Sequence, residues 1–334
     1  MSLRRWVSLW LGFAAVHATL IAENLVAPNA PLGDVEHVYP IWWSQGLSGG
    51  GWVGLTAPGV YPFLALVPIA FAGVGVAAWF TLVTVLDGVA VAVLAHRHPI
   101  AAWSWLGFQF ALGPIALGRV DAITVALAIL AVALIERSPR AAGVLVAIAT
   151  WVKVWPIVLG VAALTSPRFG VIARWSIGAA VALLAVGVIT GDSGSVVSFL
   201  GSQSSRGVQV ESVAATPWLW NAWMGGSSAV TFNEYLNTFE VSGNGTDLVA
   251  LLLTAIQGLL LAALTVLIVI VGRRGSSSLS WMSRFAASTL ALVALLITLN
   301  KVGSPQFVSW LAVPLVALVV AGAGRRSGGT IALT

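Results

Sequence analysis

The sequence contains no cysteine and very few charged residues. None of its 334 residues is Cys, and only 8% are Asp, Glu, Lys or Arg. The absence of cysteine excludes disulfides, thiol catalysis and thiolate metal sites. The shortage of charge excludes a soluble domain, whose surface needs many more charged side chains. With 59% apolar residues and a mean hydropathy of +0.97, the chain is predicted to be a polytopic membrane protein.

The histidines and basic residues do not form the patterns typical of metal or nucleic acid sites. Neither HxxH nor HExxH spacing, which zinc sites use, occurs among His17, His37, His96 and His98. The net charge of +5 comes mostly from basic residues in short loops between apolar runs. This distribution follows the positive-inside rule of membrane insertion rather than forming a basic patch. We therefore expect the lipid bilayer as a partner, no nucleic acid, and neither a metal nor another cofactor.

Apolar runs long enough to cross a bilayer recur along the chain. A spanning helix needs about 20 apolar residues. Clear spans are predicted at 6–26, 76–95, 101–118, 171–190, 248–271, 283–299 and 306–322. Shorter spans are predicted at 120–135 and in a helical hairpin of 141–152 and 154–165. The first run lacks a small-residue cleavage site and is expected to remain as a helix, whereas 60–72 contains two prolines and is predicted either to re-enter or to cross only in part.

The basic residues also predict the orientation of the chain. Twelve of the sixteen lie in loops that can share one side of the membrane. This arrangement places both termini in the cytoplasm and gives about ten crossings. It leaves two long segments, 27–58 and 191–247, on the outer side, and these hold most of the hydrophilic sequence. We therefore predict one all-α membrane domain over 1–334, a helical bundle in the cell membrane whose functional side chains face outward.

Four basic residues do not fit the cytoplasmic loops. Arg119, Lys153, Arg206 and Lys301 lie at outer helix ends or within the membrane, and they include both lysines of the chain. A cation inside a membrane costs roughly 2.5–3.5 kcal/mol at a helix centre, so it usually marks a functional site. One interpretation is that the four surround an anionic group, for which a phosphate is the natural candidate. The alternatives are ion pairs, Arg119 with Asp121 and Arg206 with Glu211, or lysines that extend to a helix end.

Two acidic residues follow the first span, in the stretch "LGDVEHVYPIWW". A carboxylate at this membrane edge suits a general base that takes a proton from an attacking hydroxyl. Asp34 and Glu36 point the same way only in an extended chain, so a single base is expected. The alternative is that Asp34 caps a helix beginning at Val35. The aromatic residues that follow, beginning with Tyr39, are expected in the membrane interface or beneath a sugar.

Several segments together resemble a known family. The stretch "LGDVEHVYPIWWSQGL" followed by "PGVYPFLALVP" resembles the first outer loop of the actinobacterial polyprenyl-phosphate-mannose-dependent mannosyltransferases, glycosyltransferase family 87 of the GT-C superfamily. Four later segments resemble that family in the same order: "PIALGRVDAITVALAILAVAL", "AGVLVAIATWVKVWPIVL", "SSRGVQVES" and "NKVGSPQFVSWLAVPL". All four unplaced cations lie within these segments.

The resemblance implies a GT-C fold with its active site on the outer face. It implies inverting transfer of a sugar, most often mannose, from a polyprenyl-phosphate donor to a hydroxyl of a cell-envelope glycolipid or glycan. The base then falls on Asp34, with Glu36 and Tyr39 as supporting residues. Matching motif positions are Lys153, Arg206, Glu211, Lys301 and Gln306, whereas Arg119 replaces a glutamine that the family generally has. A transporter or flippase of a lipid-linked anion is the alternative function.

Overall fold

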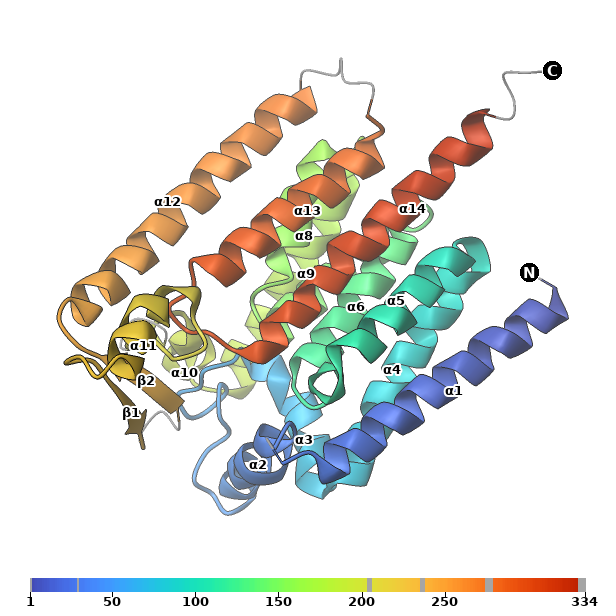
Figure 1. The fold of residues 1–334 in the computed structure, drawn as a ribbon. Helices are drawn as coiled ribbons and strands as arrows, with labels where there is room; N and C mark the ends of the chain where they lie inside the picture. The colour runs from blue at the N-terminus through green and yellow to red at the C-terminus, as the bar shows by residue number, and fades with distance from the viewer. Residues whose placement is uncertain (1, 29, 203–205, 235–237, 274–278, 330–334) are drawn as a thin grey trace.

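The computed structural model is a bundle of helices that run roughly along one common direction (Figure 1). It describes the whole chain except residues 1, 29, 203–205, 235–237, 274–278 and 330–334. In order, the α-helices are α1 (Leu3–Val26), α2 (Tyr39–Leu47), α3 (Leu66–Val74), α4 (Val76–Arg97), α5 (Pro99–Leu112), α6 (Asp121–Leu134), α7 (Pro139–Val152), α8 (Ile157–Ala162), α9 (Phe169–Thr190), α10 (Ser193–Val197), α11 (Thr216–Trp223), α12 (Thr246–Arg273), α13 (Trp281–Thr298) and α14 (Ala312–Gly329). Helical turns of other kinds include the π-helix η1 (Asp34–Val38) and the 3-10 helices η2 (Phe63–Ala65), η3 (Pro114–Ala116) and η7 (Pro305–Leu311).

The prediction of an all-α fold is correct for the membrane part but not for the second long hydrophilic segment, 191–247. There, β1 (Ala229–Asn233) and β2 (Thr238–Ser242) form an antiparallel hairpin in which Phe232 lies opposite Phe239. The centroids of these two rings lie 4.9 Å apart, with the ring planes tilted by 53° to each other. Alternating Val, Thr and Phe residues favour a strand over a helix, and this pattern was available in the sequence.

Six helical segments of the described chain are long and apolar enough to cross a membrane. They are α1, α4, α9, α12, α13 and the segment Pro305–Gly322. Helices α5, α6 and α7 have 14 residues each, which corresponds to about 21 Å, less than the ~30 Å hydrocarbon core. Helix α3 has only nine residues, which is too short to cross. The count of about ten crossings therefore stays a prediction.

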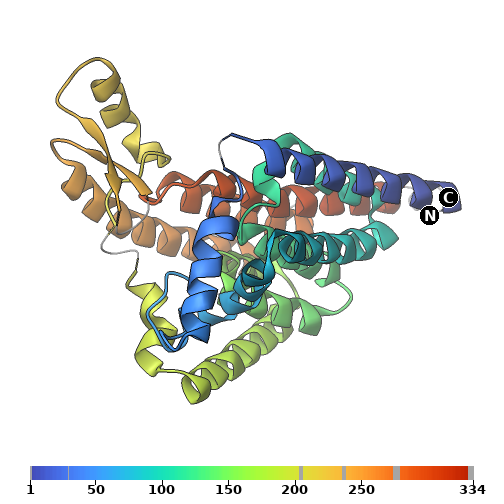
Figure 2. The ribbon, with the colours of Figure 1, turned by 90° about the horizontal axis from the view of Figure 1, so that it is seen from below.

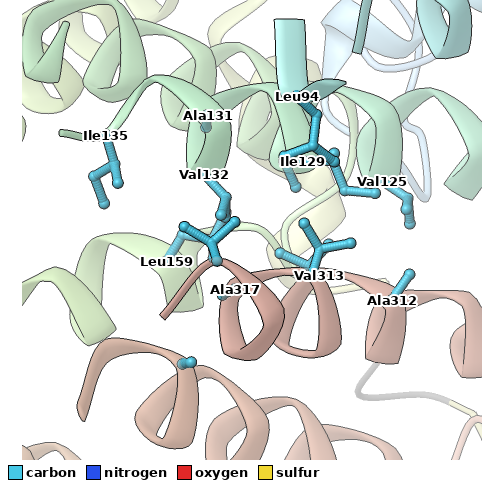
Figure 3. Close-up of a cluster of buried hydrophobic side chains, with 14 of the residues drawn as sticks. Leu94, Val125, Ile129, Ala131, Val132, Ile135, Leu159, Ala312, Val313 and Ala317 are labelled. Carbon is cyan, nitrogen blue, oxygen red and sulfur yellow. The ribbon is translucent and has the colours of Figure 1, made fainter. Parts of the chain in front are cut away.

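Helix α6 lies in the hydrophobic core of the bundle. Ten of its fourteen residues are buried, so α6 reads as a continuous apolar run rather than an amphipathic one. Figure 3 shows Val125, Ile129 and Val132 of α6 facing Ala312, Val313 and Ala317 of α14. The small alanines let the two helices approach closely, which is a common device of membrane helix packing.

The two long segments lie together at one end of the bundle. Helices α2 and α3 and the α11–hairpin region are at this end, and both chain termini are at the opposite end (Figures 1 and 2). This arrangement brings together side chains that are far apart in the sequence.

Candidate functional site

The carboxylate of Asp34 lies at this end of the bundle, in the first residue of the π-helix η1. Its Oδ1 is 2.9 Å from Nη1 of Arg119, and its Oδ2 accepts a hydrogen bond of 3.4 Å from the Tyr39 hydroxyl. The side chain is 30% exposed, so an incoming molecule can reach it. The helix begins at Asp34 itself, with Gly33 at the N-cap position and no side-chain cap. The alternative in which Asp34 caps a helix from Val35 is therefore wrong.

Arg119 is held by a tightly packed turn between α5 and α6. Trp79 Nε1 donates to the Leu117 carbonyl at 2.8 Å, and Asn24 Nδ2 donates to the Pro114 carbonyl at 2.8 Å. A Cβ on Gly118 would lie 2.6 Å from the Pro31 carbonyl oxygen, so only glycine allows this turn to approach the η1 loop so closely. The turn thereby fixes Arg119 against Asp34.

The guanidinium of Arg119 has donors to spare. Its Nε and Nη1 are buried and have no hydrogen-bond acceptor among the described residues, although Nη1 lies 2.9 Å from Asp34. The two observations agree if the N–H bond of Nη1 points away from the carboxylate, so that the contact is an ion pair rather than an aligned hydrogen bond. A buried N–H without an acceptor is costly. An anion beside Arg119 would satisfy these groups.

Lys153 forms an ion pair with Asp121, for which the sequence had suggested Arg119 as the partner. Its Nζ lies 2.6 Å from Oδ2 of Asp121, and Oδ1 of the same carboxylate accepts a 2.6 Å hydrogen bond from Trp310 Nε1. Asp121 is 1% exposed. The ammonium also lies 5.0 Å from the centre of the Phe307 ring, a favourable cation–π position. The suggested ion pair of Arg119 with Asp121 is therefore wrong, because Asp121 binds Lys153.

Two tyrosines connect these ion pairs. Burial raises the pKa of Tyr39 well above its ordinary value, and the neighbouring Tyr61 and Asp34 raise it further. Burial also raises the pKa of Tyr61, with added contributions from the carboxylates of Asp34 and Asp121. Both hydroxyls therefore stay protonated near neutral pH, and that of Tyr39 donates to Asp34. The Tyr61 ring also lies 5.5 Å from the ammonium of Lys153, so the two ion pairs belong to one polar cluster.

The other two unplaced cations, Arg206 and Lys301, lie on loops that pack against each other. The Gln209 amide N–H donates to the Lys301 carbonyl at 2.9 Å. A Cβ on Gly303 would lie 2.1 Å from the Glu211 carbonyl carbon, so glycine is required for this contact. With its side-chain amide oriented to satisfy its neighbours, Gln209 accepts from Arg206 Nη1 at 3.2 Å and donates to the Gly303 carbonyl at 3.0 Å.

Lys301 is buried, with 6% of its surface exposed. Burial lowers the pKa of its ammonium, and the charge of Glu240 works in the opposite direction. Arg206 has a buried Nε without a hydrogen-bond partner in the described chain. A small cavity of about 110 Å³ adjoins Lys301, lined also by Thr254, Gln257, Leu299 and Asn300. The second pair of cations thus also lies in polar surroundings that an anion would suit.

The remaining supporting residues lie in varied settings. Glu36 and Glu211 are exposed, and the ion pairs of the described residues do not include one between Glu211 and Arg206. The alternative ion pair that the sequence offered for Arg206 is therefore absent. The Gln306 side chain is buried and accepts a short hydrogen bond from Ser304, which fixes the start of η7. The supporting roles of these residues stay predictions.

Sequence reasoning missed several members of the site. Asp121 was considered only as a partner of Arg119, although a lone acid at the start of an apolar run signals a buried partner. Tyr61 was overlooked because its segment was expected to enter the membrane. Trp310 is one of sixteen tryptophans, and nothing in the neighbouring sequence indicated that it would bind a buried carboxylate.

Comparison with known proteins gives the class of the chain. A sequence model of glycosyltransferase family 87 matches residues 55–298, about three quarters of the sequence. The chain belongs to glycosyltransferase family 87. No curated protein and no solved structure gives a significant match.

Family membership makes the protein a membrane-embedded glycosyltransferase that takes a sugar donor and an acceptor. The matched residues include Arg119, Lys153 and Arg206 but neither Asp34 nor Lys301. The structure brings Asp34 and Lys301 next to matched segments, Asp34 against Arg119 and Lys301 against the Gln209 loop. The family 87 segment and its unmatched flanks therefore build the candidate site together.

The described residues contain no cluster of side chains suited to bind a metal ion. No group of three or more His, Asp or Glu side chains there has the arrangement to hold a metal ion. Asp34 and Asp121, the acids of the polar cluster, are each paired with a cation.

Proposed function

We propose that this family 87 enzyme transfers mannose from a polyprenyl-phosphate donor to a hydroxyl of a cell-envelope glycolipid or glycan, on the outer face of the membrane. The observation that carries the proposal is the setting of Asp34. It is a partly exposed carboxylate at the end of the bundle opposite both termini, and it contacts an arginine with unused donors. The sugar and the lipid come from the sequence resemblance, and the glycosyltransferase class comes from the family.

In the proposed reaction Asp34 is the general base. The acceptor oxygen attacks the anomeric carbon while its proton passes to the Asp34 carboxylate. The bond between the anomeric carbon and the phosphate oxygen breaks on the opposite face, and the polyprenyl phosphate leaves with the electron pair. Attack and departure on opposite faces invert the anomeric configuration.

The leaving phosphate gains negative charge in the transition state, and donors already aimed at it lower the barrier. Arg119, Arg206 and Lys301 are proposed for this role. The guanidinium groups of the two arginines have buried N–H groups without acceptors, and Lys301 adjoins a polar cavity. Lys153 contributes to the same field, although its ammonium is already bound to Asp121.

The lipid tail of the donor needs an apolar surface that faces the bilayer. Helix α12 is the most exposed of the candidate spans, since only 6% of the residues in its most apolar stretch are buried. Thr254 and Gln257 of α12 line the cavity beside Lys301. A lipid lying along α12 can therefore place its phosphate near Lys301 without leaving the membrane.

The first experiment compares sugar transfer by Asp34→Asn and by the wild type, using purified polyprenyl-phosphate mannose and a glycolipid extract. We expect the variant to bind the donor while its turnover falls at least about 10²-fold, because general base catalysis contributes 10²–10⁴. Glu36→Gln is the matched control, since Glu36 lies two residues away and is exposed. Equal turnover in Asp34→Asn and the wild type would exclude Asp34 as the base, and loss of turnover in Glu36→Gln alone would assign the role to Glu36.

The sequence also left open a transporter of a lipid-linked anion. Membership of a glycosyltransferase family favours transfer over transport. If the wild type transferred no sugar from any polyprenyl-phosphate donor but moved the lipid between leaflets, the proposed function would be wrong.

A further inference from the structure

A second basic region lies away from the candidate site, on the outside of the bundle. A groove of about 620 Å³ runs between α7 and α9. Arg140 and Arg174 line it together with Trp175, and Val144, Gly178 and Ala182 continue it along the two helices. Helix α9 lies at the edge of the bundle (Figure 2), and only 11% of the residues in its most apolar stretch are buried. The groove therefore opens toward lipid.

The chemistry of the groove is basic at one end and apolar along the rest. Both arginines are exposed, and neither takes part in an ion pair within the described part of the chain. The Arg140 guanidinium lies 5.9 Å from the centre of the Trp175 ring, which holds it over the groove. No acidic residue lines the groove. Its charge therefore favours an anion, and its apolar walls favour an acyl chain.

Small residues make this shape possible. A Cβ on Gly143 of α7 would lie 2.5 Å from the Ile172 carbonyl oxygen, so glycine lets the two helices cross in close contact. Beside this crossing, Gly178 and Ala182 leave the surface of α9 without large side chains. Helix α9 presents larger residues elsewhere, including Ile177 and Val181, which are exposed.

We infer that this groove binds an anionic phospholipid, with the headgroup phosphate between Arg140 and Arg174 and an acyl chain along Val144, Gly178 and Ala182. Basic pockets between membrane helices commonly hold anionic headgroups, and each arginine near a charged headgroup contributes about a fivefold gain in affinity. The lipid belongs to the leaflet at the N-terminal ends of α7 and α9, which the basic residues predict to be cytoplasmic. This site is separate from sugar transfer, and its occupancy does not depend on the proposed function.

Native mass spectrometry of the detergent-solubilised protein tests the inference. The probes are phosphatidylglycerol and phosphatidylcholine with the same acyl chains, which differ in headgroup charge. We expect one phosphatidylglycerol molecule to bind in preference to phosphatidylcholine. The double variant Arg140→Gln/Arg174→Gln should bind it about 25-fold more weakly, from two contributions of about fivefold each. Arg137→Gln removes an equal charge just before α7, from a residue that does not line the groove, and it should bind as the wild type does.

A second pair of variants tests the apolar part. Ala182→Leu fills the groove and should weaken phosphatidylglycerol binding with both arginines present, whereas the neighbouring Val181→Leu should not. Because the substituted side chains are exposed, elution volume and helical content should stay as in the wild type. Equal binding of the two lipids, undiminished binding by the double variant, or an equal loss in Arg137→Gln would overturn the inference. If excess inorganic phosphate displaced the lipid completely, the groove would be a site for free phosphate rather than for lipid.

Discussion

At the scale of single residues, the site is defined by which cation binds which carboxylate. Arg119 contacts Asp34 at 2.9 Å, and Lys153 contacts Asp121 at 2.6 Å. The two lysines of the chain therefore differ in setting, because Lys153 is paired with Asp121 inside the bundle whereas Lys301 adjoins a cavity. Arg119 is only partly satisfied, because two of its buried nitrogens have no hydrogen-bond acceptor among the described residues. The phosphate of an anionic donor would accept hydrogen bonds from these nitrogens.

Replacing Arg119 by methionine keeps the length of the side chain and removes its donors. We expect kcat to fall about 10²-fold, because the loss of one preorganised donor to a developing negative charge costs 10²–10³. Arg119→Gln should keep more activity, because glutamine is the residue that the family resemblance predicts at this position. Steady-state kinetics with varied donor measure the effect. Wild-type kinetics in Arg119→Met would remove Arg119 from the phosphate site.

The pKa of Lys301 predicts a limit on the alkaline side of the pH profile. A cation loses its charge when the pH rises past its pKa, and burial lowers the pKa of this ammonium. The donor KM should therefore begin to rise at a lower pH than an ordinary lysine would cause. In Lys301→Arg the rise should move to higher pH, because the pKa of a guanidinium lies above about 12. An unchanged profile in this variant would mean that Lys301 does not bind the donor.

At the scale of elements, η7 and the turn before α6 organise the end of the bundle that carries the candidate site. Trp310 of η7 stacks on Trp155 at 5.2 Å and donates to Asp121 at the start of α6. Lys153, just past the end of α7, binds the same carboxylate. One buried acid thus joins three elements that are far apart in the sequence. Its position explains why Lys153 is a structural residue as well as a proposed contributor to the donor site.

Breaking this contact should destabilise the protein strongly when only one partner is removed. Lys153→Met and Asp121→Leu each leave a charge buried alone, at a cost of about 3–5 kcal/mol, and each should lower the midpoint of thermal unfolding in detergent. The double variant removes both charges and should regain most of the loss. Its activity then separates the two roles of Lys153. A stable double variant without donor binding supports a role at the phosphate, whereas one with normal donor binding limits Lys153 to holding the fold.

At the scale of the whole molecule, the two long segments meet at the end of the bundle opposite the termini. This arrangement agrees with the predicted division into a face that carries the site and a face that carries the basic loops. The α11–hairpin region adds an exposed apolar surface at the site end, with Trp223 and Met224 both exposed. The orientation of the bundle in the membrane rests on the basic residues.

The absence of cysteine makes this orientation directly measurable, because every introduced thiol is the single one in the chain. Trp223→Cys lies in an exposed part of the site end and should react with a membrane-impermeant maleimide in intact cells. Arg137→Cys lies in the connection between α6 and α7 and should react only after the membrane is permeabilised. The reverse result would place the candidate site in the cytoplasm and exclude an outer-face transferase.

The sequence by itself determined the helices and the residues worth suspecting. Most of their bounds follow from apolar runs, which encode burial in lipid along the chain, but α5 ends at Leu112 where the apolar run predicted a span to residue 118. The four unplaced cations were visible because a charge that breaks a membrane pattern is conspicuous. Even the family followed from ordered local motifs, and the match over residues 55–298 confirms it. The hairpin in the second long segment is the exception, since that segment was interpreted only as a hydrophilic connection and its short alternating stretch was not recognised.

Only the tertiary structure decided which of these residues meet. Asp34 and Arg119 are separated by two helical hairpins, and Asp121 and Trp310 by most of the chain, so no local pattern relates them. The sequence suggested an ion pair between Arg119 and Asp121 because they are close neighbours along the chain. The fold instead pairs each of them with a residue that is distant in sequence. The physical reason is that charges in an apolar bundle are satisfied by geometry, since the nearest opposite charge in space, and not in sequence, offsets the cost of burial.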